Sequence, residues 1–166
     1  YLPIVQPYYF IRRSAPRGGL TSVELAVMPT AGTVNGVNSA GLSIACNYAY
    51  AIDTGPLGPT ITMLIAEALA RFRTVEEAAD YFQQMPRVGG GLLMLGDASG
   101  QIAALEISNS RVCVRHADAD CLVHTNRYCD PRMRDVELHP GAIYSEQSPR
   151  ALRDRPVHQA SLCRDN

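Results

Sequence analysis

The sequence predicts a single α+β domain in which a pair of helices covers one face of an antiparallel sheet. Strand-like alternation and turn residues occur on both sides of two helical segments, which differs from the βαβ alternation typical of a parallel sheet. The chain has 166 residues, enough for one sizeable core but few for two ordinary domains. Its 46% hydrophobic and 19% charged residues are typical of a globular protein. We therefore treat residues 1–166 as one domain.

Two segments that precede the helices predict the first part of the sheet, and an N-terminal apolar run comes before them. Residues 8–11 form an apolar run, and a basic turn over residues 12–19 follows it. Residues 21–28 alternate between apolar and other side chains, as a strand with one buried face does. Residues 32–50 predict two short strands, the first ending at Thr33 and Val34, with a polar turn at residues 38–41 between them.

Asparagines follow apolar runs at two places in the chain. Asn47 stands where the alternation of the second short strand stops, and Asn126 follows residues 121–124, which we expect to form another strand. An asparagine in such a position is most often a turn-former. Two side-chain amides held by rigid strands can also donate N–H groups to a developing oxyanion or orient an amine. Both interpretations stay open from the residues alone.

Two helices are expected in the middle of the chain. Thr60 is a suitable N-cap, and apolar residues at helical spacing follow it as far as Phe72. Residues 74–77 form a capping box, in which Thr74 and Glu77 would satisfy each other's backbone amides. A single turn separates the two helices, so they are expected to cover the same face of the sheet.

The remaining strands are predicted after the helices. Residues 92–95 are fully apolar, residues 97–100 have the composition of a hairpin turn, and residues 102–107 predict the returning strand. A further strand is expected at residues 110–116. Glu106 is a charged residue inside an apolar strand, and we expect it to pair with an arginine rather than to take part in function.

Composition excludes several classes of function. A net charge of −1 argues against a nucleic-acid-binding surface, and no apolar run reaches transmembrane length. The five cysteines are odd in number and irregularly spaced, unlike a disulfide framework. Cys121, His124 and Cys129 have ligand-like spacing, but a structural zinc site needs a fourth ligand. Many Cys–His pairs can be drawn from the chain, and no local signature selects one as a nucleophile.

Residues 34–47 (VNGVNSAGLSIACN) resemble a glycine- and asparagine-containing segment of the penicillin acyltransferase (acyl-CoA:6-aminopenicillanic acid acyltransferase) family, which is related to the choloylglycine hydrolases. Shorter matches follow in the family's order at residues 67–69, 74–78, 97–100, 105–106, 124–126, 145–150 and 161–164. The first segment is fairly specific, whereas each of the shorter ones carries weight only as part of the series.

The resemblance implies an N-terminal-nucleophile (Ntn) hydrolase with a four-layer αββα sandwich, incomplete in this chain. In such enzymes a cysteine freed by self-cleavage attacks an amide carbonyl, and its own α-amine serves as the base. By position, Asn47 matches the side-chain oxyanion donor, and Asn126 matches the asparagine that holds the nucleophile's amine and the intermediate. Arg150 matches a site arginine of the family.

The resemblance also implies where residues should be absent and which side chains meet the substrate. None of the five cysteines matches the family's nucleophile, which is therefore expected upstream of Tyr1. Further residues are expected to be missing near Arg150 and beyond Asn166. Tyr48, Tyr50 and His124, which neighbour the two asparagines, are expected to bind the substrate.

The expected function is that of an amide hydrolase or acyltransferase that acts on a small acylated amine, at a non-peptide C–N bond. We expect no metal and no cofactor, and neither nucleic acid nor a membrane as partner, while a homo-oligomer stays open. A cytoplasmic location is preferred to a secreted one. Without the upstream cysteine, the present chain is expected to be inactive. The alternative is a non-catalytic relative that keeps the fold as a binding or interaction module.

Overall fold

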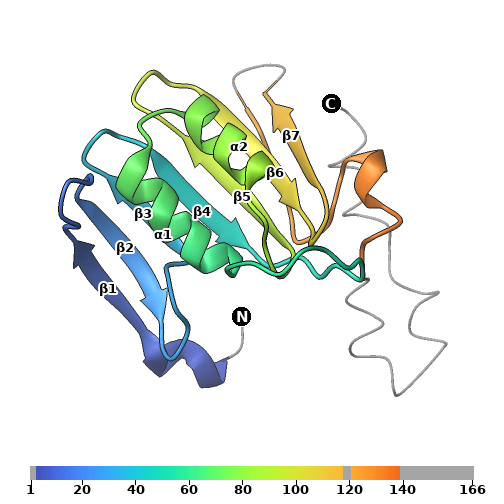
Figure 1. Ribbon diagram of the computed structural model, residues 1–166, viewed down its shortest axis with the longest axis horizontal. Coiled ribbons are helices and arrows are strands. Elements are labelled where there is room, and N and C mark those ends of the chain that lie inside the picture. The colour runs from blue at the N-terminus through green and yellow to red at the C-terminus, as the bar shows by residue number, and fades with distance from the viewer. Residues whose placement is uncertain (1–2, 118–120, 139–166) are drawn as a thin grey trace.

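The computed structural model describes residues 3–117 and 121–138, which form one antiparallel sheet and a pair of helices (Figure 1). The seven strands lie in the order in which they occur in the chain, each paired with its sequence neighbour. The strands are β1 (Tyr9–Ser14), β2 (Ser22–Val27), β3 (Asn35–Asn38), β4 (Ser43–Asn47), β5 (Gly91–Gly96), β6 (Ile102–Ile107) and β7 (Val112–His116). The helices are α1 (Ile61–Arg71), α2 (Val75–Gln84) and the short 3₁₀ helices η1 (Pro3–Tyr8) and η2 (Pro131–Met133). The predicted α+β class is confirmed.

Both helices lie between β4 and β5 in the chain and cover the same face of the sheet (Figure 1). Helix α1 packs against β3 and β4, and α2 packs against β6 and β7. The predicted capping box is present: Thr74 Oγ1 accepts the N–H of Glu77, whose carboxylate accepts the N–H of Thr74. Asp97 in the β5–β6 hairpin accepts the N–H of Val75 at 2.8 Å, which fixes the start of α2 to the sheet.

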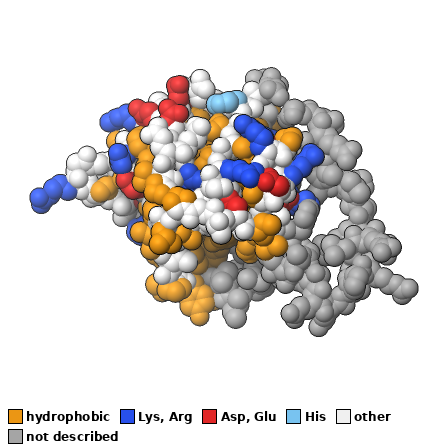
Figure 2. Space-filling view, turned by 45° about the vertical axis from the view of Figure 1, so that its right-hand side comes forward, with side chains coloured by type: hydrophobic (Ala, Val, Ile, Leu, Met, Phe, Trp, Pro, Cys, Tyr) orange, Lys and Arg blue, Asp and Glu red, His pale blue; other side chains and the backbone are white. Residues whose placement is uncertain are grey.

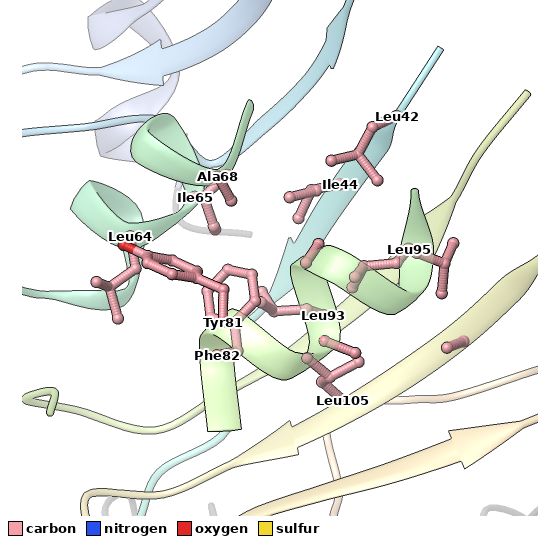
Figure 3. Close-up of a cluster of buried hydrophobic side chains, with 14 of the residues drawn as sticks. Leu42, Ile44, Leu64, Ile65, Ala68, Tyr81, Phe82, Leu93, Leu95 and Leu105 are labelled. Atoms are coloured by element: carbon pink, nitrogen blue, oxygen red, sulfur yellow. The ribbon is translucent and has the colours of Figure 1, made fainter. Parts of the chain in front are cut away.

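The main core lies between the helices and the strands beneath them (Figure 3). Side chains from the inner stripe of each helix meet alternate side chains of β4, β5 and β6, as the predicted spacings require. The members drawn and labelled in Figure 3 are Leu42, Ile44, Leu64, Ile65, Ala68, Tyr81, Phe82, Leu93, Leu95 and Leu105, all buried. Among the described residues, no helix has the length and apolarity that crossing a bilayer requires.

The opposite face of the sheet is covered over β5–β7 by residues 121–138. Leu92 and Cys113, which alternate with core residues along their strands, pack there with Tyr128, Met133 and Val136 in a second buried cluster. Over β1–β3 the same face is open within the described part of the chain. Exposed apolar residues there are Ile11, Val23 and Val37.

Two predicted boundaries in the first hairpins are wrong for an identifiable reason. Strand β1 continues through Arg12 to Ser14, where a basic turn was expected, because Arg12 pairs across the ladder with the buried Glu24. Strand β3 begins at Asn35 and ends at Asn38, later than expected. The Asn38 amide donates to the carbonyls of Leu69 and Phe72, and its oxygen accepts two N–H groups of the turn that follows.

The strand expected at residues 121–124 is also wrong. These residues belong to no strand of the sheet, although they follow the edge strand β7. Their apolar pattern is only two residues long, Leu122 and Val123, which is too short to impose a register. A side chain holds the segment instead, because the Arg115 guanidinium donates to the Val123 carbonyl.

Candidate active site

Asn47 is the last residue of β4 and lies on the face of the sheet opposite the helices. Its neighbours Ile44 and Cys46 contribute to the core under the helices, and strand alternation turns Asn47 the other way. It pairs in register with Leu92, which belongs to the second buried cluster on that opposite face. Asn47 itself is exposed. The rigid sheet therefore presents its amide at the border of the covered part of this face.

Asn126 reaches the same place from the far end of the described chain. Its Nδ2 donates to the backbone carbonyl of Tyr48, the residue after Asn47, at 2.9 Å. The chain that follows Asn47 is also hydrogen-bonded to residues 136–138. The Leu138 N–H donates to the Tyr50 carbonyl, and the Ile52 N–H donates to the Val136 carbonyl. The structure thus brings together the two asparagines that the sequence singled out.

Asn126 is not at a strand end, contrary to expectation, and buried carboxylates hold its segment in place. Glu106 of β6 accepts the N–H of Cys129 at 3.0 Å and the N–H of Asp130 at 2.9 Å. Glu137 accepts the N–H of Tyr128 at 3.2 Å and pairs with the Arg127 guanidinium at 2.8 Å. Sequence reasoning missed Glu137, because a glutamate among polar residues near the end of a segment carries no distinctive signal.

The arginine partner expected for Glu106 is confirmed as Arg115. Its Nε lies 2.9 Å from Glu106 Oε1. The two form an ion pair, although the Nε–H is not aligned for a hydrogen bond. Glu106 has 0% of its surface exposed, so the ion pair is buried on the carboxylate side. In the view of Figure 2, basic and acidic side chains lie interspersed with apolar ones on the surface.

The two tyrosines expected to bind the substrate lie beside Asn47 and are exposed. Tyr48 exposes 52% and Tyr50 exposes 47% of its surface in the part of the chain that the structure describes. Desolvation raises the pKa of Tyr48, and the charges of Cys46, Tyr9 and Tyr50 add to the shift. The Tyr48 hydroxyl therefore stays protonated at neutral pH and can donate a hydrogen bond.

The remaining predicted site residues are His124 and Arg150. His124 lies two residues before Asn126, is partly buried, and has Nδ1 3.0 Å from the carbonyl of Thr125. That nitrogen is therefore engaged with the backbone, and only Nε2 is left for a ligand. Arg150 lies outside the described residues, as do the matching segments at 145–150 and 161–164.

The free thiols of the described residues differ in reactivity. Burial raises the pKa of Cys46 to about 12, and its side chain lies on the helix side of β4, away from Asn47. Burial also raises the pKa of Cys113, which is buried in the second cluster. Neither is suited to be a nucleophile, because the thiolate is the reactive form. Cys121 is exposed.

A cavity of about 600 Å³ lies elsewhere, between α2 and β7 on the helix side of the sheet. Its walls include Glu76 and Asp80 of α2, His116 of β7, and Arg132. Since Asn47 points to the opposite face, this cavity is separate from the pair of asparagines. Among the described residues, no three His, Cys, Asp or Glu side chains gather closely enough to bind a metal ion.

Comparison with known proteins gives one family and several solved structures. A family model described as acyl-coenzyme A:6-aminopenicillanic acid acyl-transferase matches residues 3–154. No curated protein matches the chain. Penicillin V acylase from Agrobacterium tumefaciens is 26% identical with a TM-score of 0.50, and the match covers 58% of this chain and 33% of that protein.

Two further solved structures are similar in fold alone. A mutant of the conjugated bile acid hydrolase from Clostridium perfringens is 16% identical with a TM-score of 0.50, covering 60% of this chain and 36% of that one. An N-acylethanolamine-hydrolyzing acid amidase ortholog from Caenorhabditis elegans is 13% identical with a TM-score of 0.50, covering 70% and 54%. The chain thus matches a third to about half of these proteins, and the Ntn-hydrolase fold is confirmed.

Proposed function

Because the chain belongs to the acyl-coenzyme A:6-aminopenicillanic acid acyl-transferase family, we propose that it is part of an enzyme that hydrolyses or transfers the acyl group of a small acylated amine. The observation that carries the proposal is the hydrogen bond from Asn126 to the Tyr48 carbonyl. It joins two segments that are distant in the sequence and sets two side-chain amides at one border of the open sheet face.

Each asparagine has a chemical role that its position allows. Asn47 donates its side-chain N–H to the oxyanion that develops on the substrate carbonyl. The Asn126 amide is oriented by its bond to Tyr48, which leaves the Oδ1 atom to accept an N–H from the nucleophile's α-amine. Arg150 is proposed as the site arginine, and Tyr48, Tyr50 and His124 as contacts for the substrate.

The proposed nucleophile is a cysteine upstream of Tyr1. Its sulfur attacks the amide carbon, the α-amine passes the thiol proton to the leaving amine, and a thioester remains. Attack on the thioester by water completes hydrolysis, and attack by another amine completes acyl transfer. The raised pKa values of Cys46 and Cys113 support a nucleophile other than these two thiols.

The test uses the complete gene product rather than the present chain. We expect it to carry a terminal cysteine that an N-terminal thiol reagent blocks, with loss of activity. Penicillin V, a conjugated bile acid and an N-acylethanolamine are suitable probes, since relatives of the same fold are named for them. Cys121→Ser is the matched control, because Cys121 is an exposed thiol with no role in the proposal, and it should keep full activity.

An unprocessed chain without a reactive terminal cysteine would refute the proposed enzyme. If such a chain still bound one of the three probes, the result would favour the alternative, a non-catalytic relative that uses the fold as a binding module.

A further inference from the structure

Three successive backbone N–H groups follow Asn126 closely, and all three donate to buried carboxylates. The N–H of Tyr128 donates to Glu137, and those of Cys129 and Asp130 donate to Glu106. Glu106 is fully buried, and Glu137 has 9% of its surface exposed. Carboxylates are rarely buried unless they are paired, and hydrogen bonds from N–H groups to an ionised carboxylate are strong.

We propose that Glu106 and Glu137 are positioning residues that hold Asn126 at the end of β4. The inference rests on the proposed function, because it takes Asn126 to act in the reaction. Neither glutamate touches the reacting atoms. Each acts through the backbone between residues 127 and 130.

The argument starts from the absence of regular structure around Asn126. Residues 121–130 belong to no helix or strand, so no ladder of backbone hydrogen bonds fixes their register. Glu106 lies near the end of β6, next to the edge strand β7, and Tyr128 donates its hydroxyl to the carbonyl of Ile107, the residue after Glu106, at 2.6 Å. The end of β6 thus holds the loop at two points. These two contacts add to the Arg115 bond to the Val123 carbonyl, the Asn126 bond to Tyr48 and the disulfide of Cys129.

Glu137 ties the same loop to the chain that follows Asn47. It forms an isolated antiparallel bridge with Ala51, four residues after Asn47. Its carboxylate then reaches back to the N–H of Tyr128, two residues after Asn126. The segments that carry the two asparagines are therefore connected through one glutamate as well as through the bond from Asn126 to the Tyr48 carbonyl.

Packing alone would not require carboxylates here. Burying a charge is unfavourable, and a hydrophobic residue of similar volume often gives equal or greater stability than a buried ion pair. Glu106 lies beside the apolar second cluster, where such a residue would pack well. What a hydrophobic side chain cannot do is accept the N–H groups of Cys129 and Asp130 and so fix the path of the loop.

The experiment is a double-mutant cycle in the complete enzyme. Glu106→Gln keeps the shape but replaces one acceptor oxygen with an NH₂ group that faces the loop amides. We expect kcat to fall by about 10², the loss typical of a misplaced catalytic group, with KM little changed. Asn126→Ala should lower kcat as well. If Glu106 acts through Asn126, the double variant should be no slower than Asn126→Ala.

The matched control is Glu24→Gln. Glu24 is another buried glutamate paired with an arginine, Arg12. It lies on β2, on the face of the sheet that the helices cover. This variant should lower the melting temperature while the folded enzyme keeps its kcat. If Glu106→Gln does not fold, Glu137→Gln makes the same test. Hydrogen exchange of the 128–130 amides in the unaltered enzyme tests the contacts without any substitution.

The outcomes separate this inference from the function on which it rests. Normal kcat in Asn126→Ala would overturn the proposed role of Asn126 and the positioning role with it. Loss in Asn126→Ala together with normal kcat in the glutamine variants, or with additive effects in the cycle, would overturn the positioning role alone. Amides 128–130 that exchange as fast as those of an unfolded peptide would do the same.

Discussion

Asn38→Ala is predicted to be among the most destabilising single substitutions in the described chain. The Asn38 side chain is buried and makes four hydrogen bonds, all to backbone groups. Its Nδ2 donates to the Leu69 and Phe72 carbonyls at the C-terminus of α1, at 2.8 and 2.7 Å, where helix carbonyls lack internal partners. Its Oδ1 accepts the N–H groups of Ala40 and Leu42.

The magnitude follows from counting these bonds. At about 1 kcal/mol each, the four bonds contribute about 4 kcal/mol to the free energy of unfolding. Water can reach the partly exposed partners, such as the Ala40 amide, so we expect a loss of about 3 kcal/mol. Since whole domains are stable by only about 5–15 kcal/mol, this is a large fraction of the total.

Urea unfolding of the complete protein, followed by circular dichroism, measures the change. Asn47→Ala is the control, because Asn47 is exposed and its alanine variant should unfold at nearly the same urea concentration. A loss below about 1 kcal/mol for Asn38→Ala, with an unchanged m-value, would refute the idea that this side chain joins α1 to the β3–β4 turn.

Three further predictions concern catalysis, acid stability and thiol reactivity. Asn47→Ala should lower kcat by about 10²–10³ with little change in KM or melting temperature, as expected for an oxyanion donor, and a normal kcat would exclude that role. Hydrogen bonding and charge from Arg132 lower the pKa of Asp130 to about 2, so its contribution to stability is complete above its unfolded pKa near 4 and disappears as pH falls towards 2. The stability difference between the unaltered protein and Asp130→Asn should therefore shrink between about pH 5 and about pH 2.5 in urea titrations; a constant difference would contradict this. Iodoacetamide at about pH 8 should label Cys121 long before Cys46, whose pKa is about 12, and mass spectrometry of the peptides would show the order.

Local signals in the sequence were sufficient for most of the fold. The capping box at Thr74 and Glu77 acts within one turn of chain, and the return strand at residues 102–107 was predicted with its observed bounds. Such features depend on neighbours in the sequence. The end of β1 was wrong because it depends on Arg12 meeting Glu24 across the ladder, a contact between side chains that composition does not reveal.

The sequence singled out Asn47 and Asn126 but did not reveal the architecture that brings their segments together. Asn47 and Asn126 each follow an apolar run, and the resemblance to a family gave them roles. A loop held by Glu106 and Glu137 brings Asn126 to Tyr48. A glutamate that accepts backbone N–H groups from a distant segment produces no periodic pattern in the sequence. A charged residue inside an apolar strand, such as Glu106, is the nearest signal in the sequence for a contact of this kind.

The sequential order of the strands has a consequence for how the domain folds. All strand pairs but one join segments separated by short turns, so their contacts form early at little loss of chain entropy. The exception is β4 with β5, whose pairing must close the loop formed by residues 48–90. Both helices lie within that loop, and a helix shortens the span between its ends. Helix formation therefore brings the two halves of the sheet closer before they pair, and substitutions that weaken α1 or α2 should slow folding more than equally destabilising ones in the outer strand β1.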